Sequence, residues 1–436
     1  MSDLQSWVGG MARRQASLAG SGPAWLGNLR KQALARFVDE GWPTARQEAW
    51  RHTSLAALAQ QTFSLPDDAA ASSPLQRPYT DADEGHWMVF VDGAYAPGLS
   101  RVGALPAGVA LQPLSDVVAS GPDRLEELMG SESDGATPVA LNLALAADGA
   151  FIHVPRGVAL EDPVHLVFIA TGRGLASFPR NLVQAEAGSQ AVIMEHFVGQ
   201  GDGASHTNSV TRLALEADAH VTHLKLQHED TSAFHLGATD VTLQKGSVFT
   251  SHSMSFGAQL ARHDISADFR GMHGELLLNG LYYVNGRRHV DHQTVIRHSE
   301  PACVSREYYR GVLDDTSRGV FGGRIFVAPG ADKTDAVQRS DSLLLSRLAK
   351  ADARPELEIY ADDVKCAHGA TVGQIDADSL FYLRSRGLDE THARHVLTYA
   401  FAAQAVNRIE PESLRRRVIG AIRALAPRGA ELGDFS

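Results

Sequence analysis

Cys366 and His368 are the pair of side chains whose types and spacing most clearly suggest chemistry. They stand one residue apart in the segment EIYADDVKCAHGATVGQID, which runs from Glu358 to Asp376. Residues i and i+2 of a β-strand point to the same side, so in a strand the thiol and the imidazole would lie next to each other. A thiolate beside an imidazole can bind a soft or borderline metal such as iron or zinc. The pair is therefore a candidate metal site.

Two ligands are only half of a coordination shell. An iron–sulfur cluster usually takes about four protein ligands, most of them cysteines, and the chain has two cysteines in all. Any iron or nascent cluster held by Cys366 and His368 is therefore expected to be transient and shared across an interface. The alternative is that Cys366 is a small core residue and His368 an edge residue bonded to backbone.

The other cysteine and the histidines favour structural roles. Cys303 lies in a strand-like run without an adjacent histidine, which predicts a core residue. The cluster of His289, His292 and His298 could suggest a metal or proton-transfer site. However, a spacing of three places His289 and His292 on opposite faces of a strand. Carboxylates paired for acid–base work, a nucleophile elbow and a phosphate loop are missing from the sequence, which predicts a chain that is not an enzyme.

Composition narrows the classes of function. The formal net charge is −11 and the isoelectric point is about 5.9, which disfavours a nucleic-acid binder. A run of about 18 apolar residues and a signal peptide are both missing from the sequence, so we expect a cytoplasmic protein without a membrane partner. Two cysteines in so long a chain are expected to be reduced thiols.

A degenerate repeat indicates the fold. From Val154 to Ile375 short strand-like runs alternate with turn residues. The turn residues Gly188, Asp218 and Gly246, with Gly274 after them, are separated by 30, 28 and 28 residues. A repeat of this length built from strands predicts a β-helix, with a sandwich or a barrel as alternatives. Before it, MVFVDGAY predicts two strands joined by an Asp-Gly turn.

Helical patterns lie on either side of the strands. Apolar residues at three- and four-residue steps predict a helix from Pro23 to Glu40, and Pro, Ser, Asp and Gly predict a linker at about residues 65–85. The expected division is a helical region with linker at 1–85, a β-helix at 86–376 and a helical region at 377–436.

The C-terminal region is expected to hold two helices and a frayed tail. Asp389 is a plausible N-cap for the first helix, and the second begins near Pro411. The stripe on the first helix either packs on the β-structure or receives a partner. Its residues are Ala393, Val396, Leu397, Ala400, Phe401 and Gln404.

Four segments together resemble the SufB/SufD family of iron–sulfur cluster assembly proteins. The longest is YADDVKCAHGATVGQID, and the others are PTARQEAWRHTSL, HVDHQTVIRHSEP and PGADKTDAVQRSDSLLLS. They are spread over most of the chain. The low cysteine count favours the SufD-like branch of the family, since SufB-like members usually carry more cysteines.

The resemblance implies a right-handed parallel β-helix with helical N- and C-terminal regions. It implies a non-catalytic scaffold that pairs with a SufB-like paralogue through the end of the β-helix. A SufC-like ABC ATPase would bind the C-terminal helices, from Asp389 to Leu425. The resemblance carries the interface histidine of the family to His368 and its neighbouring cysteine to Cys366. No permanent cofactor is expected, and a homodimer of the isolated chain stays open.

The alternative function is a polysaccharide-active enzyme. Such enzymes also use β-helices, with carboxylates and a bound calcium ion on an exposed face. The sequence shows no converging acidic set that would favour this reading.

Overall fold

The computed structural model describes residues 2–19, 22–66, 75–77, 79–80, 83–120, 125–131, 133–172 and 174–425. About half of the predicted linker at 65–85, and the C-terminal tail from residue 426, lie outside these ranges. The first strand begins at His86 and the last ends at Gln374.

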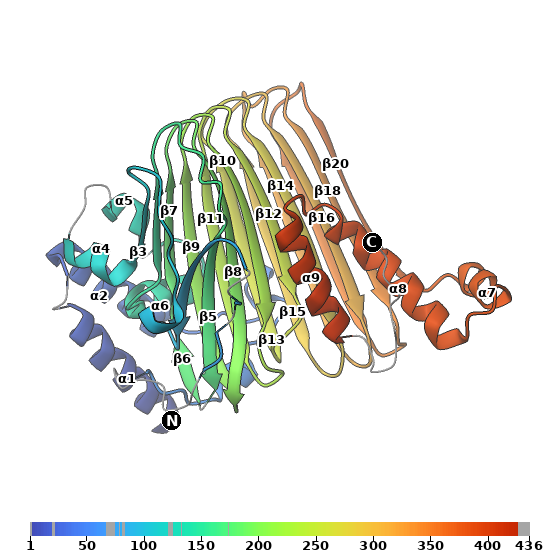
Figure 1. Ribbon diagram of the computed structural model, residues 1–436, viewed down its shortest axis with the longest axis horizontal. Coiled ribbons are helices and arrows are strands. Elements are labelled where there is room, and N and C mark those ends of the chain that lie inside the picture. Colours follow the sequence, from blue (N-terminus) through green and yellow to red (C-terminus); the bar gives the residue numbers. More distant parts are fainter. Residues whose placement is uncertain are drawn as a thin grey trace.

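The strands form two sheets that face each other across a solenoid and are parallel except for the terminal strands β2 and β3, which pair antiparallel (Figure 1). Strands of the two sheets alternate along most of the chain, so each coil adds one strand to each sheet. The first sheet holds, in spatial order, β2 (Ala94–Tyr95), β1 (His86–Val91), β5 (Val164–Gly172), β8 (Gln190–Asp202), β10 (His220–His228), β12 (Val248–Ser255), β14 (Glu275–Val284), β16 (Val304–Leu313), β18 (Asp335–Leu344) and β20 (Lys365–Gln374). The second sheet holds β19 (Lys350–Ile359), β17 (Arg318–Val327), β15 (His289–His298), β13 (Leu260–Phe269), β11 (Phe234–Leu243), β9 (Ser205–Leu215), β7 (Arg180–Ala185), β4 (Ala150–Val154) and β3 (Ala110–Pro113), with β6 (Leu175–Ser177) beside β9. The predicted parallel β-helix with helical ends is confirmed.

The turns of successive coils stack in a column of left-handed residues. Gly188, Asp218 and Gly246 have φ values of 69°, 57° and 66°. The stacked turns are joined by hydrogen bonds, such as that from the Gly188 N–H to the Ala217 carbonyl at 2.9 Å. The predicted repeat is therefore present. In its fourth unit the left-handed residue is His273, with φ 62°, and not the predicted Gly274.

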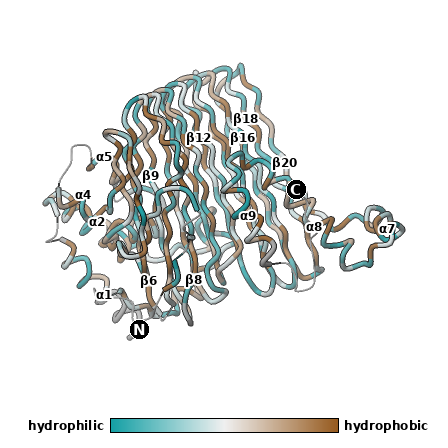
Figure 2. Tube along the Cα trace, viewed as in Figure 1, coloured by the Kyte–Doolittle hydropathy of each residue, from teal (hydrophilic) through white to brown (hydrophobic). Residues whose placement is uncertain are grey.

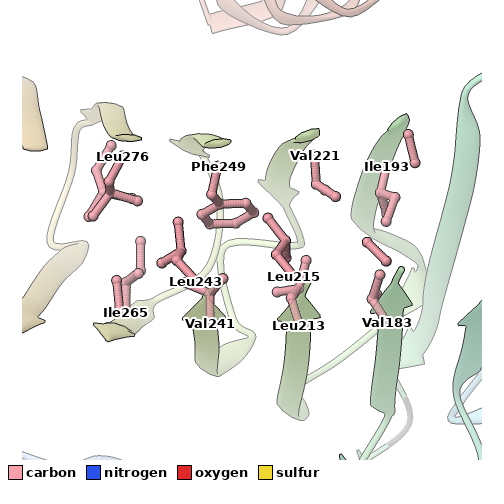
Figure 3. Packing of buried hydrophobic residues seen from close by; sticks show 14 of the residues in the cluster. Val183, Ile193, Leu213, Leu215, Val221, Val241, Leu243, Phe249, Ile265 and Leu276 are labelled. Atoms are coloured by element: carbon pink, nitrogen blue, oxygen red, sulfur yellow. The ribbon is translucent and has the colours of Figure 1, made fainter. Parts of the chain in front are cut away.

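The interior of the solenoid, between the two sheets, is here called the bore. One half of the bore is apolar along its length. Figure 3 shows side chains of the two sheets meeting there, with Val221, Phe249 and Leu276 on one side and Val241 and Ile265 on the other. All five are almost fully buried. Burial of such side chains is the main favourable term in folding, so this half is the principal core of the solenoid.

The other half of the bore is polar. Glu195, His223 and Lys225 lie inside it, with the Lys225 ammonium 3.7 Å from a Glu195 carboxylate oxygen and 3.9 Å from the centroid of the Phe197 ring. Buried charges need partners, and here adjacent coils supply them. The polar half continues toward the C-terminal end, where the strands become more hydrophilic around β18 and β20 (Figure 2).

Helices cover the N-terminal end of the solenoid (Figure 1). The predicted helix at 23–40 is confirmed as α2, and its buried residues include Leu26, Ala33 and Phe37. Helix α1 and the helices between residues 114 and 145 were not predicted from the sequence. All nine residues of α6 are buried, so this helix has no polar face and no amphipathic period to detect. The bounds are α1 (Ser2–Ala19), α2 (Ala24–Glu40), η1 (Glu48–Trp50), α3 (Ala56–Ala59), η2 (Pro97–Leu99), α4 (Leu114–Ser120), α5 (Leu125–Met129) and α6 (Thr137–Leu145).

Three helices follow the last strand. They are α7 (Ala377–Ser385), α8 (Glu390–Val406) and α9 (Glu412–Leu425). As predicted, Asp389 caps α8, because its side chain accepts a hydrogen bond from the His392 N–H. Helices α8 and α9 lie along the first sheet, whereas α7 projects away from the solenoid (Figure 1).

We predict that Phe249→Ala lowers the free energy of unfolding by about 3–5 kcal/mol, because it leaves a cavity in the apolar half of the bore. Leu348→Ala is the control, since the Leu348 side chain is 66% exposed. It should change the free energy of unfolding by less than about 0.5 kcal/mol. Urea unfolding followed by circular dichroism measures both, and equal effects of the two changes would contradict the assigned core.

Candidate functional site

Cys366 and His368 lie on β20, the last strand of the first sheet. Cys366 is in register with Ala336 of β18, and His368 with Gln338. Ala336 and Gln338 are both buried in the bore. The strand register therefore places Cys366 and His368 on the inward side of the final coil, on the common side that their spacing predicts.

The two side chains differ in exposure, although both lie on β20, a strand of the last coil. Cys366 is half-buried and packs against the apolar core, whereas His368 is exposed. Within the part of the chain that the structure describes, no strand pairs with the outer edge of β19 or β20. The bore is thus open at its C-terminal end, with the imidazole at the mouth and the thiol just inside it.

The thiols are free, as predicted. Burial raises the pKa of the Cys366 thiol above its usual value, and the neighbouring Asp335 acts in the same direction. Cys366 is therefore a neutral thiol near pH 7, and metal binding there would have to release its proton. In the described ranges, no group of three or more His, Cys, Asp or Glu side chains is arranged to hold a metal ion.

Cys303 is a core residue, as the sequence predicts. It is fully buried, and its Sγ donates to the Gly271 carbonyl at 3.3 Å. Burial raises the pKa of its thiol. Cys366 and Cys303 therefore differ chiefly in access to solvent, which gives the chain an internal reference thiol.

The predicted separation of the histidine cluster is also found. The His289 Nε2 lies 2.9 Å from the Thr53 hydroxyl, His292 stacks on Tyr282, and the His298 Nε2 lies 2.9 Å from the Ser305 hydroxyl. Burial lowers the pKa of His292 and of His298 to about 4, so both are neutral at pH 7. The three rings have separate partners, and each fits a structural role.

The predicted partner stripe on α8 is divided between the solenoid and solvent. Ala393 is buried, Val396 and Leu397 are half-buried, and Ala400 is exposed. Phe401 and Gln404 both contact Arg310 of β16. The guanidinium lies 4.5 Å from the centroid of the Phe401 ring, and its Nη2 donates to the Gln404 Oε1 at 2.5 Å. The C-terminal end of the stripe thus faces the solenoid.

Two sets of exposed apolar side chains were not predicted from the sequence. Phe381 and Tyr382 on α7 are 74% and 56% exposed. Ile359, Tyr360 and Val372 are exposed at the open end of the solenoid. The helix that holds Phe381 and Tyr382 is too short to give a periodic signal, and the open end is visible only once the strands are stacked.

Comparison with known proteins identifies the family. A family model described as the SUF system FeS cluster assembly SufBD core domain matches residues 168–401, and one described as the SufBD protein N-terminal region matches residues 2–166. This chain belongs to the SufBD family of iron–sulfur cluster assembly proteins. The match covers both the N-terminal helical cover and the solenoid with its open end.

Several SufBD relatives are similar to this chain over most of their length. The iron–sulfur cluster assembly protein SufD of Escherichia coli is 34% identical over 92% of this chain and 93% of its own. A SufBD family protein of Synechocystis is 30% identical over 93% of this chain and 92% of its own. The chloroplastic protein ABCI7 of Arabidopsis thaliana is 26% identical over 92% of this chain and 86% of its own. The resemblance to a SufD-like member is confirmed.

This SufBD-family chain also holds a buried carboxyl group behind the mouth. Strand register aligns one residue from each neighbouring strand in a row across the sheet, here called a rank. Glu307 belongs to an inward-facing rank on β14, β16, β18 and β20 that consists of Leu278, Glu307, Gln338 and His368. The Gln338 Nε2 donates to the Glu307 Oε2. Burial raises the pKa of Glu307 from 4.5 to about 7, although the Thr294 and Gln338 side chains oppose this rise. Glu307 was not predicted from the sequence, because a lone Glu in REYYRG gives no signal of burial.

We predict that Glu307 makes stability pH-dependent. The folded chain holds the Glu307 proton more tightly than the unfolded chain between about pH 4.5 and pH 7. The contribution of Glu307 to the free energy of unfolding should therefore fall as pH rises through this window, by on the order of 3 kcal/mol at most, while the buried histidines contribute with the opposite sign.

Glu307→Gln removes this contribution, so the free energy of unfolding of the variant minus that of the parent chain should be larger at pH 8 than at pH 4.5. Urea unfolding at several pH values measures the effect. Glu275→Gln is the matched control, since Glu275 is an exposed carboxylate on β14. If the pH profile of Glu307→Gln coincides with that of the parent chain, the assigned pKa is wrong.

Proposed function

We propose that this chain is a non-catalytic scaffold subunit of the SUF machinery, supporting iron acquisition and cluster formation at an interface shared with a SufB-like paralogue. The observation that carries the proposal is the placement of Cys366 and His368 at the open end of the bore. A thiol and an imidazole can take up iron or part of a nascent cluster as substrate, and a second subunit would supply the remaining ligands.

The open end also supports docking of the SufB-like paralogue. The outer edges of β19 and β20 present backbone donors and acceptors that a facing chain can pair. Ile359, Tyr360 and Val372 add exposed apolar area at the same end. An end-to-end contact would bury these side chains and bring the ligands of the paralogue to the mouth. When the paralogue is absent, we propose that two copies of this chain can dimerise through the same end.

The SufC-like ABC ATPase is proposed to bind the projecting C-terminal helices. Phe381 and Tyr382 on α7 supply exposed aromatic area, a common feature of binding hot spots. Tyr382 and Leu383 line a shallow hollow together with Leu397 of α8, a member of the predicted stripe. Phe401 and Gln404, from the same stripe, hold α8 on the solenoid instead. The proposed ATPase surface is therefore centred nearer to α7 than the sequence analysis expects.

A scaffold of this kind needs no permanent cofactor. The Cys366 thiol is protonated near neutral pH, so substrate iron binds only where a partner or a base favours loss of the proton. We place the protein in the cytoplasm, where the two free thiols stay reduced. No helix among the described residues is long and apolar enough to cross a membrane.

We predict that His368→Ala leaves complex formation intact and lowers the yield of clusters. The chain is reconstituted anaerobically with its paralogue and its ATPase, and the product is followed by visible absorbance. His220→Ala is the matched control, because His220 is also exposed and lies at the start of β10. The proposal fails if His368→Ala and the parent chain give equal yields from equal amounts of complex.

We predict that Phe381→Ser with Tyr382→Ser weakens ATPase binding by about tenfold or more, because aromatic anchors carry much of the energy of an interface. Purified components and a binding titration measure the loss. Both side chains are exposed, so thermal stability should be unchanged. Binding of the paralogue serves as the control and should also be unchanged, whereas unaltered ATPase affinity would exclude α7 from the interface.

A further inference from the structure

A rank of polar side chains crosses the outer face of the first sheet near its open end. Strand register aligns Arg310 of β16 with Asp341 of β18, and Asp341 with Thr371 of β20. These three residues therefore lie side by side on one face, one per coil. The rank begins under helix α8 and ends on the strand that holds Cys366 and His368.

Arg310 joins this rank to α8 through several contacts. Its guanidinium lies 4.5 Å from the centroid of the Phe401 ring, and its Nη1 donates to the Phe401 carbonyl at 3.4 Å. Its Nη2 donates to the Gln404 Oε1 at 2.5 Å and to the Asp341 Oδ2 at 3.3 Å. Because one planar group makes all these contacts, α8 cannot shift without disturbing Arg310.

Asp341 joins Arg310 to the final strand. Its Oδ2 also accepts from the Arg339 Nε at 2.9 Å, and its Oδ1 accepts from the Thr371 hydroxyl at 2.5 Å. The Asp341 side chain is only 6% exposed, so its carboxylate is largely shielded from solvent even though Arg339 and Thr371 are exposed. Hydrogen bonds to a shielded carboxylate are stronger and more directional than those of an exposed one.

Other contacts hold α8 and the turn after it on strands that precede β20. Asn279 donates to the Ala405 carbonyl of α8, and Arg408 in the turn after α8 lies over the Tyr308 ring. The Arg394 Nη2 of α8 donates to the Leu345 carbonyl, just after β18, at 3.1 Å. Asn279 and Tyr308 belong to one rank, and that rank reaches Gly369 on β20, which has no side chain. The contact of α8 at Arg310, in contrast, continues through the Asp341 and Thr371 side chains onto β20.

We propose that Arg310 and Asp341 are positioning residues that couple the place of α8 to the exposure of Cys366 and His368. The proposal rests on the function proposed above, since a partner that moves α7 and α8 would act on this rank. Displacement of Phe401 and Gln404 draws Arg310 from Asp341, and the Asp341 bond to Thr371 weakens with it. Among the strands that the structure describes, β20 pairs along one edge alone, so it responds more readily than an inner strand.

The test measures alkylation of Cys366 in the isolated full-length chain, with each thiol quantified by peptide mass spectrometry. Arg310→Met should raise the alkylation rate of Cys366 about three- to tenfold, a change expected for a coupled site. Cys303 is fully buried and should stay unreactive, which separates a local change at β20 from general unfolding. An unchanged Cys366 rate, or equal acceleration at Cys303, would overturn the proposal.

The matched control is Arg417→Met on α9. Arg417 fastens the helical pair at the opposite end of the sheet, where its Nη2 donates to Asp83 and its guanidinium lies over the Trp87 ring. This variant should leave the Cys366 rate unchanged. Acceleration equal to that of Arg310→Met would show that any loosening of the helices suffices, which contradicts a specific route. If Arg310→Met does not fold, Gln404→Ala tests the same link from the surface of α8.

A double-mutant comparison tests the route itself. Thr371→Val removes the last link and should also accelerate alkylation of Cys366. Arg310→Met with Thr371→Val should then be no faster than the faster single variant, because both break one path. If the double variant is accelerated by the product of the two single-variant factors, the two residues act independently, which contradicts the proposal. These measurements need no partner, so a failure to bind the ATPase would count against the proposed function and leave this result standing.

Discussion

The backbone N–H and C=O groups of a strand in a parallel sheet need hydrogen-bond partners on both edges. The candidate site depends on the C-terminal end of the solenoid, where one edge of the last strands lacks such partners among the described residues. Each coil of the solenoid supplies ladder partners to the coil before it, and helices with short antiparallel strands close the N-terminal end. Within the described ranges, β19 and β20 have no such partner on their outer edges. The constraint that gives the inner coils their stability thus leaves the last coil ready to receive another chain.

The bore determines what lies behind that end. Its apolar half holds the coils together, while its polar half brings Glu307 and Gln338 in line with the exposed His368. Inward-facing residues of inner coils are sealed by the next coil, and on β20 the same positions are open to solvent. The chemistry of Cys366 and His368 therefore follows from their place in the stack, since the same pair on an inner coil would be buried.

Sequence patterns predicted the parts of this arrangement that are local or periodic. The turn repeat, the capped helix after Asp389 and the common side of Cys366 and His368 all follow from the spacing of residues along the chain. Glu307 and the exposed pair Phe381 and Tyr382 could not be found this way, because burial and exposure depend on coils and helices far away in the sequence. Helix α6 was missed because it is buried on every side, so it has no polar face to mark it.

The central claim is that a second subunit covers the mouth where Cys366 lies. The most direct measurement attaches a short photo-crosslinker to Cys366 in the complex with the paralogue and identifies what it captures. The control places the probe on Gln112→Cys, an exposed position on β3 at the other end of the solenoid. The account predicts capture of the paralogue from Cys366 and not from position 112. Capture from position 112 alone would contradict it.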